Sequence, residues 1–97
     1  MVQSKAGAYT VALGGCLPDN KRLTKPLCVV IEHGDGEVIV TEPQFYIHAA
    51  GRTEAEALEA FKRRLVGYLD VLGRREETLG ARLHDQLQFL RAFIRVA

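Results

Sequence analysis

The sequence predicts an α+β fold: a small antiparallel sheet of three to four strands packed on a long helix, followed by a C-terminal amphipathic helix. Three observations support this prediction. Apolar and polar residues alternate in short stretches through the first half of the chain, as in strands with two distinct faces. A helix-capping motif then begins a helical repeat at Thr53, and a second helical repeat follows near the end. The 97 residues are expected to form a single domain.

Four segments show the two-residue period of a strand. They are Tyr9–Leu13, Leu27–Glu32, Glu37–Thr41 and Phe45–Ala50. His33–Gly36 is expected to join the second and third as a tight turn, because glycine accepts positive φ and aspartate favours turns. Pro43 has no amide hydrogen, so the chain is expected to break near Glu42. Gly14–Pro26 is punctuated by glycine and proline and is predicted to be a loop.

The first helix is predicted to run from Thr53 to about Leu72. Thr53 can accept a hydrogen bond from the Glu56 amide while the Glu56 carboxylate reaches back to the Thr53 amide, which is the capping-box arrangement. Gly51 allows the sharp turn before it, and Gly73 is expected to end the helix. One apolar stripe follows the helical period. It consists of Leu58, Phe61, Leu65, Leu69 and Leu72.

The second helix is predicted over Ala81–Arg95, within a C-terminal segment of about residues 79–96, after a charged connector. Its apolar stripe is wider than one contact requires, and the strands carry apolar residues on both faces. Either the last helix covers the second face of the sheet, or one of these surfaces is an interface. A chain this short buries a modest core, so we expect a homo-oligomer.

Composition excludes several classes of protein. The net charge of +1 argues against holding nucleic acid by bulk electrostatics alone. Cys16 and Cys28 form no CxxC pair or metal pattern, and Cys28 is expected to be a small buried hydrophobe. No segment approaches the ~18–20 apolar residues of a membrane span, and the first residues lack the apolar run of a signal peptide. We therefore expect a soluble cytoplasmic protein with no membrane partner.

The sequence contains no catalytic motif. A nucleophile elbow, a phosphate loop and a nucleophile–base pair are all missing, so we expect no enzyme activity and no cofactor. His33, Asp35 and Glu37 cluster at a hairpin tip, where a hard cation is one interpretation. Their spacing matches no known metal loop, so a solvated turn is the preferred interpretation and no metal is expected.

Two groups of residues are candidate contacts. Tyr46 and His48 are two apart on a predicted strand, so both are expected to point to one face. A helix covering this face is one interpretation; contact with a base or with a protein partner is the other, and we take both residues as partner-binding candidates. Leu87, Leu90 and Phe93 of the last helix join them as partner-binding candidates.

Lys62, Arg63 and Arg64 form the strongest basic cluster, which suits phosphate contact by an oligomeric nucleic-acid-binding transcriptional regulator. Interleaved glutamates also fit a mixed, solvated surface. A phage or defence-system accessory or inhibitor protein is a third interpretation.

The order of these elements and their residues resembles the HicB-like antitoxin family. The resemblance rests on the hairpin Ile31–Val40, on Glu42–Pro43, and on His48–Leu58, where Gly51, Thr53, Glu56 and Ala57 occupy a Gly-x-Thr-x-x-Glu-Ala pattern. It covers roughly residues 27–72, with an N-terminal strand and loop over 1–26 and the last helix outside it. It implies a degenerate ribonuclease-H-like fold without catalysis, and an antitoxin that neutralises a small RNA-cleaving toxin by direct binding.

Overall fold

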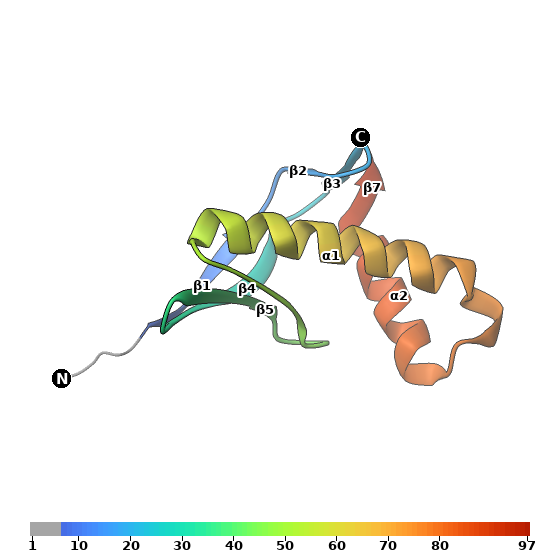
Figure 1. Ribbon diagram of the computed structural model, residues 1–97. Helices are drawn as coiled ribbons and strands as arrows, with labels where there is room; N and C mark the ends of the chain where they lie inside the picture. Colours follow the sequence, from blue (N-terminus) through green and yellow to red (C-terminus); the bar gives the residue numbers. More distant parts are fainter. Residues whose placement is uncertain (1–6) are drawn as a thin grey trace.

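The computed structural model describes residues 7–97 and has an α+β architecture, as predicted (Figure 1). It contains two antiparallel sheets, two α-helices and one short 3-10 helix (η1). The elements in chain order are β1 (Ala8–Leu13), β2 (Cys16–Leu17), β3 (Lys21–Leu23), β4 (Leu27–Gly34), β5 (Glu37–Glu42), β6 (Ile47–Gly51), α1 (Glu54–Arg74), η1 (Glu76–Thr78), α2 (Ala81–Phe93) and β7 (Ile94–Val96).

The larger sheet has the strand order β1-β4-β5-β6, and every neighbouring pair is antiparallel. The predicted turn joins β4 to β5, with Gly36 at a φ of 75° that suits glycine. β4 extends beyond the predicted Glu32 to Gly34. β6 begins at Ile47, two residues later than predicted, because the preceding residue Tyr46 has a φ of 60° and belongs to a turn.

One face of this sheet, the inner face, packs on α1 and forms the core. Val29, Ile31 and Val40 are fully buried on the sheet side, and Phe61 and Leu65 are fully buried on the helix side. Burying each such side chain contributes about 1.5–3 kcal/mol. The predicted helical stripe is shifted slightly. Leu58 and Leu69 lie at its edge and are half-buried, whereas Ala57 and Val66 are buried.

The junction between β6 and α1 is tightly constrained. The Glu56 amide donates to Thr53 Oγ1 at 3.1 Å, as predicted. The Glu56 carboxylate accepts from the Arg52 amide at 3.1 Å, one residue earlier than predicted. A Cβ on Gly51 would lie 2.5 Å from the Ala57 backbone nitrogen. Gly51 is therefore needed because the end of β6 lies directly against the first turn of α1.

Both helices end differently from the prediction. α1 passes through Gly73 to Arg74, whose side chain pairs with Asp70 one turn earlier. Gly73 does not adopt the left-handed conformation with which a glycine ends a helix, and Arg75 caps the end by donating its amide to the Leu72 carbonyl. α2 ends at Phe93 rather than Arg95, because the next three residues pair with β3 as a strand.

The predicted loop Gly14–Pro26 was wrong in part, because it contains β2 and β3. With β7 these strands form a second sheet, ordered β2-β3-β7, which we call the ribbon. Its strands of two and three residues are too short to show a period in the sequence. Leu23 and Ile94, which are register partners, bury its inner side. In Figure 1 the ribbon and the larger sheet lie on opposite sides of α1.

A matched pair of glycine substitutions tests the β6–α1 junction. We expect Gly51→Ala to lower the free energy of unfolding by roughly 1–3 kcal/mol, since the new methyl group meets backbone atoms. Gly67→Ala, in the interior of α1 with nothing within 4 Å of its Cβ position, should raise it by up to about 1 kcal/mol. Urea unfolding of both variants measures this, and changes of the same sign would contradict the assigned contact.

Candidate interaction surface

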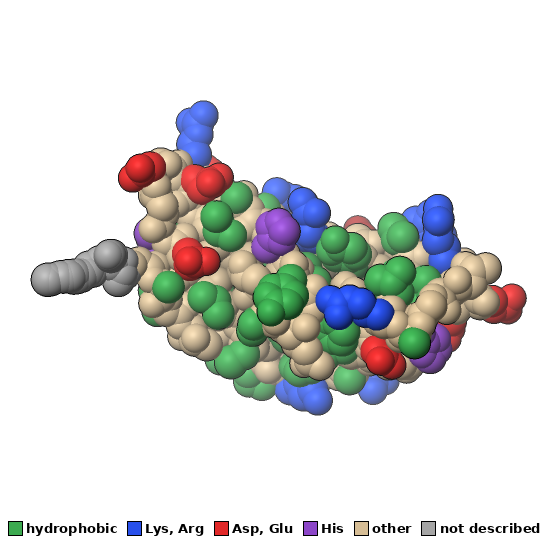
Figure 2. Space-filling view, turned by 90° about the horizontal axis from the view of Figure 1, so that it is seen from below, with side chains coloured by type: hydrophobic (Ala, Val, Ile, Leu, Met, Phe, Trp, Pro, Cys, Tyr) green, Lys and Arg blue, Asp and Glu red, His purple; other side chains and the backbone are tan. Residues whose placement is uncertain are grey.

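The second face of the larger sheet is covered by no described element. α1 packs on the inner face, and α2 packs on α1 and β7 rather than beneath the sheet. The alternative that the last helix covers the second face of the sheet is therefore wrong, and an interface on this face stays a prediction. Figure 2 views the molecule from this side and shows hydrophobic side chains spread from the sheet across to α2.

This outer face consists of four cross-strand rows set by the register. The rows are Gly34–Glu37, Ala8–Glu32–Ile39–Ala50, Thr10–Val30–Thr41–His48 and Ala12–Cys28. Most of these side chains are small or apolar, and all are exposed or half-buried. Their carboxylates are Glu32 and Glu37. A flat surface of this composition suits packing against another protein more than binding a small molecule.

A turn at the end of the sheet presents Tyr46. Glu42 is buried, with 3% of its surface exposed, and its two carboxylate oxygens accept hydrogen bonds from the amides of Gln44 and Phe45, each at 2.8 Å. These bonds satisfy backbone donors that face the carboxylate inside the turn. Tyr46 follows in the left-handed region and is 69% exposed. Sequence reasoning placed a chain break here but missed the role of Glu42.

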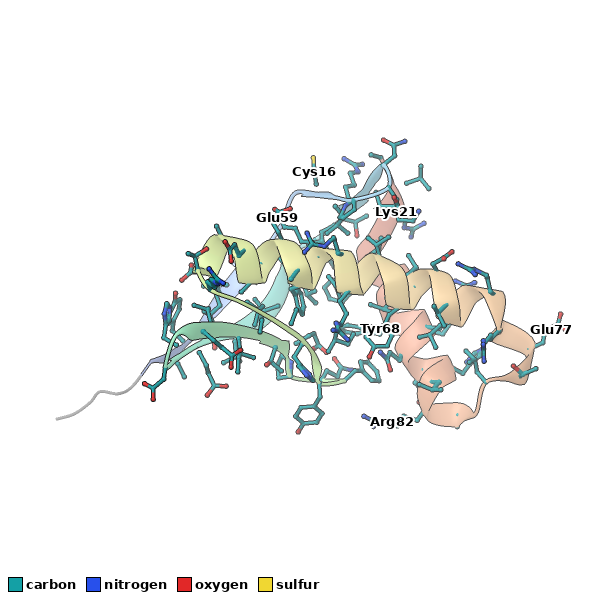
Figure 3. The ribbon with its side chains drawn as sticks, in the orientation of Figure 1. Cys16, Lys21, Glu59, Tyr68, Glu77 and Arg82 are labelled. Atoms are coloured by element: carbon teal, nitrogen blue, oxygen red, sulfur yellow. The ribbon has the colours of Figure 1, made fainter. Side chains whose placement is uncertain are left out.

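The surface continues from this turn onto α2. Phe45 packs on Phe89, with ring centroids 5.1 Å apart, and Phe89 packs on Phe93 at 4.8 Å. The Arg82 guanidinium lies 6.0 Å from the Phe45 ring, and the Lys25 ammonium lies 4.5 Å from the Phe93 ring. Figure 3 shows Arg82 projecting from the start of α2. This aromatic cluster was not predicted, because it joins two segments far apart in the chain.

The partner-binding residues predicted on the last helix require correction. Leu87 is 0% and Leu90 is 1% exposed, because α2 packs this stripe onto α1. Neither side chain is at the surface. Phe93 is half-buried within the aromatic cluster. Tyr46 and His48 are both exposed, but the prediction that they share a strand is wrong, because only His48 belongs to β6 and Tyr46 lies in the preceding turn. His48 Nδ1 lies 3.2 Å from the Tyr46 carbonyl oxygen.

Cys28 is also exposed, contrary to the prediction of a buried residue, because even-numbered positions of β4 point to the outer face. Cys16 is exposed on the ribbon, and both thiols are free.

A titratable cluster lies at the other end of the sheet. The Tyr9 hydroxyl donates to a Glu54 carboxylate oxygen, and His33 Nε2 lies 3.6 Å from the same oxygen. The tyrosine and histidine rings stack, with centroids 6.0 Å apart. The bond to Glu54 raises the pKa of Tyr9. Within residues 7–97, His, Cys, Asp and Glu side chains form no group of three that could hold a metal ion.

The structure separates the predicted basic cluster on α1. Lys62 lies 3.8 Å from Glu59, and Lys62 and Arg63 line a cleft with the β2 end of the ribbon. Arg64 follows Lys62 by two residues, or roughly 200° of helical rotation, and so lies on nearly the opposite side of α1. The predicted cluster is therefore divided between the cleft that holds Lys62 and Arg63 and a separate surface that holds Arg64.

Other cations are held by carboxylates. Arg91 binds Glu76 through two contacts of 2.9 Å, which lowers the pKa of Glu76, and Arg74 lowers the pKa of Asp70 in the same way.

Charge is unevenly divided along the chain. Residues 27–59 hold seven carboxylates and one arginine, whereas the other described residues hold eleven Lys and Arg side chains and five carboxylates. The larger sheet, apart from β1, and the start of α1 are thus strongly acidic. The ribbon, the rest of α1 and α2 are basic.

No family model, curated protein or solved structure matches the chain. The resemblance to HicB-like antitoxins therefore stays a prediction. Neither described helix is long and apolar enough to cross a membrane.

The role of Glu42 in shaping the Tyr46 turn can be tested with Glu42→Gln. The amide offers one acceptor oxygen where the turn needs two, so we expect a loss of about 1–3 kcal/mol in the free energy of unfolding. Amide hydrogen exchange at Gln44 and Phe45 should also become faster. Glu37→Gln, at the exposed start of the same strand, is the matched control and should stay within about 0.5 kcal/mol of the wild type. An equal change in the free energy of unfolding for both variants would contradict the role of Glu42 in the turn.

Proposed function

We propose that this chain is a non-catalytic, antitoxin-like protein-interaction module that neutralises a small RNA-cleaving toxin by direct binding. The observation that supports this proposal is the uncovered outer face of the larger sheet, extended by Tyr46 and the aromatic cluster at Phe45. An apolar face of a small protein is normally covered, and an exposed one marks an interaction site. His48 and Tyr46 would lie near the centre of the contact.

Charge also supports this class of partner. A protein that cleaves RNA needs cations to hold the phosphodiester chain, so its active surface is basic. The strands that carry most of the outer face belong to the acidic part of the chain, residues 27–59. Complementary charge speeds encounter and selects the partner, while apolar contact supplies most of the affinity.

The chemistry of the outer face favours binding over catalysis. Its histidine, His48, lies in a different row from its carboxylates, Glu32 and Glu37. A nucleophile, the base that activates it and the group that orients this base must lie within hydrogen-bond reach of one another. The function proposed for these residues is therefore contact.

Substitutions on the outer face test the proposal. We expect Val30→Lys and His48→Lys to reduce recovery of the partner at least tenfold in a tagged pull-down from the native host, since each buries a charge in the contact and repels a basic partner. Nuclease treatment of the lysate excludes bridging by nucleic acid. Val71→Lys introduces the same charge at an exposed apolar position of α1 and should leave recovery unchanged. Light scattering of each eluate gives the stoichiometry, and unfolding curves confirm that each variant is folded.

A ribonuclease-like partner of fixed stoichiometry, lost only in the outer-face variants, would support the proposal. Its toxicity in cells should then be suppressed by the wild-type chain and not by Val30→Lys. Equal recovery with Val30→Lys and Val71→Lys would exclude the outer face as the contact. Recovery of the chain only as a homo-oligomer would favour an accessory protein over an antitoxin.

A further inference from the structure

The ribbon carries two arginines directly opposite each other. The register of β3 and β7 pairs Arg22 with Arg95, and Cys16 of β2 pairs with Arg22 on the other side. All three residues are exposed, while the alternate residues Leu17, Leu23 and Ile94 are buried. The period of the strands therefore places Cys16, Arg22 and Arg95 in one row on the outward side of the ribbon.

Neither arginine is neutralised. Among the described residues, no carboxylate lies within 4.0 Å of either guanidinium, whereas Arg74 and Arg91 each have a carboxylate partner. Like charges directly opposite on neighbouring strands destabilise a sheet. A sheet of three very short strands has little stability to lose, so this pairing points to an anion as its complement.

The row of cations continues onto α1. Cys16 lines a cleft with Lys62 and Arg63, and Figure 3 shows Cys16 on the ribbon above the part of α1 that carries Glu59. Arg22, Arg95, Lys62 and Arg63 therefore form a strip, which we call the basic strip. The carboxylates nearby are Glu59, which faces Lys62 at 3.8 Å, Asp19 in the turn between β2 and β3, and Asp70, which lines a cleft with Arg95 and pairs with Arg74. The strip keeps a net positive charge.

We propose that the basic strip binds the phosphate backbone of double-stranded DNA. Guanidinium groups match phosphate oxygens with paired hydrogen bonds. The strip has no aromatic side chain on which single-stranded bases would stack. The major groove of B-form DNA admits a pair of strands such as β3 and β7, which carry the two arginines, whereas the major groove of an RNA duplex is too narrow. The strip lies across α1 from the outer face, so this contact is independent of the proposed protein partner.

Fluorescence anisotropy with a short labelled DNA duplex tests this inference. Each phosphate contact contributes about 0.9 to the slope of log affinity against log salt, so Arg22→Gln/Arg95→Gln should lower that slope by roughly 2. Between about 50 and 200 mM NaCl the wild type should then lose roughly tenfold more affinity than this variant. Arg64→Gln/Arg75→Gln removes the same charge from exposed positions outside the strip and should change the slope by less than about 1.

Thermal unfolding shows whether a loss of DNA binding comes from loss of the fold. Removing the opposed arginines should leave the melting temperature unchanged or higher. Absence of DNA binding at low salt would overturn the inference. Equal slopes for the two double variants would reduce the effect to bulk charge and would also overturn it. Tighter binding to an RNA duplex of the same length, or to polyglutamate, would assign the strip to another class of ligand.

Discussion

The burial of Phe61 and Leu65 of α1 against the inner face of the larger sheet is the contact on which the rest of the structure depends. It sets which residues of each strand face inward, since a shift of one residue would turn every side chain to the other face. It also requires Gly51, because the helix begins directly after the last strand and must turn back over the sheet without space for a methyl group.

The length of α1 determines what packs beside it. Its 21 residues span about 31 Å, whereas β5 and β6, the strands on which it mainly packs, span about 17–20 Å. The C-terminal half of the helix therefore extends beyond the sheet, and its apolar residues are covered by α2 and the ribbon. Because α2 is used there, it does not cover the outer face of the sheet. Among the described elements, only α1 packs on the larger sheet, so the outer face of this sheet is left uncovered. This face is the surface proposed to bind a partner.

The division of charge follows the same geometry. Acidic residues concentrate on the larger sheet and the start of α1, and basic residues concentrate on the ribbon and the rest of the helices. The two proposed contacts therefore lie on opposite sides of α1 and attract opposite charges. A basic protein and a DNA backbone would not compete for one surface. A chain with a net charge of only +1 can thus present a basic surface on the ribbon and a mostly apolar surface within its acidic part.

The sequence by itself determined the elements whose signals are local: the alternation of β1, β4 and β5, the turn at Gly36 and the Thr53 cap of α1. The sequence also predicted that Tyr46 and His48 contact a partner, and both side chains are exposed in the structure. Only the tertiary structure decided that Leu87 and Leu90 are buried, that Arg22 faces Arg95, and that the outer face stays open. These features depend on pairing between segments far apart in the chain. Strands of two or three residues are too short to show a pattern that predicts such pairing.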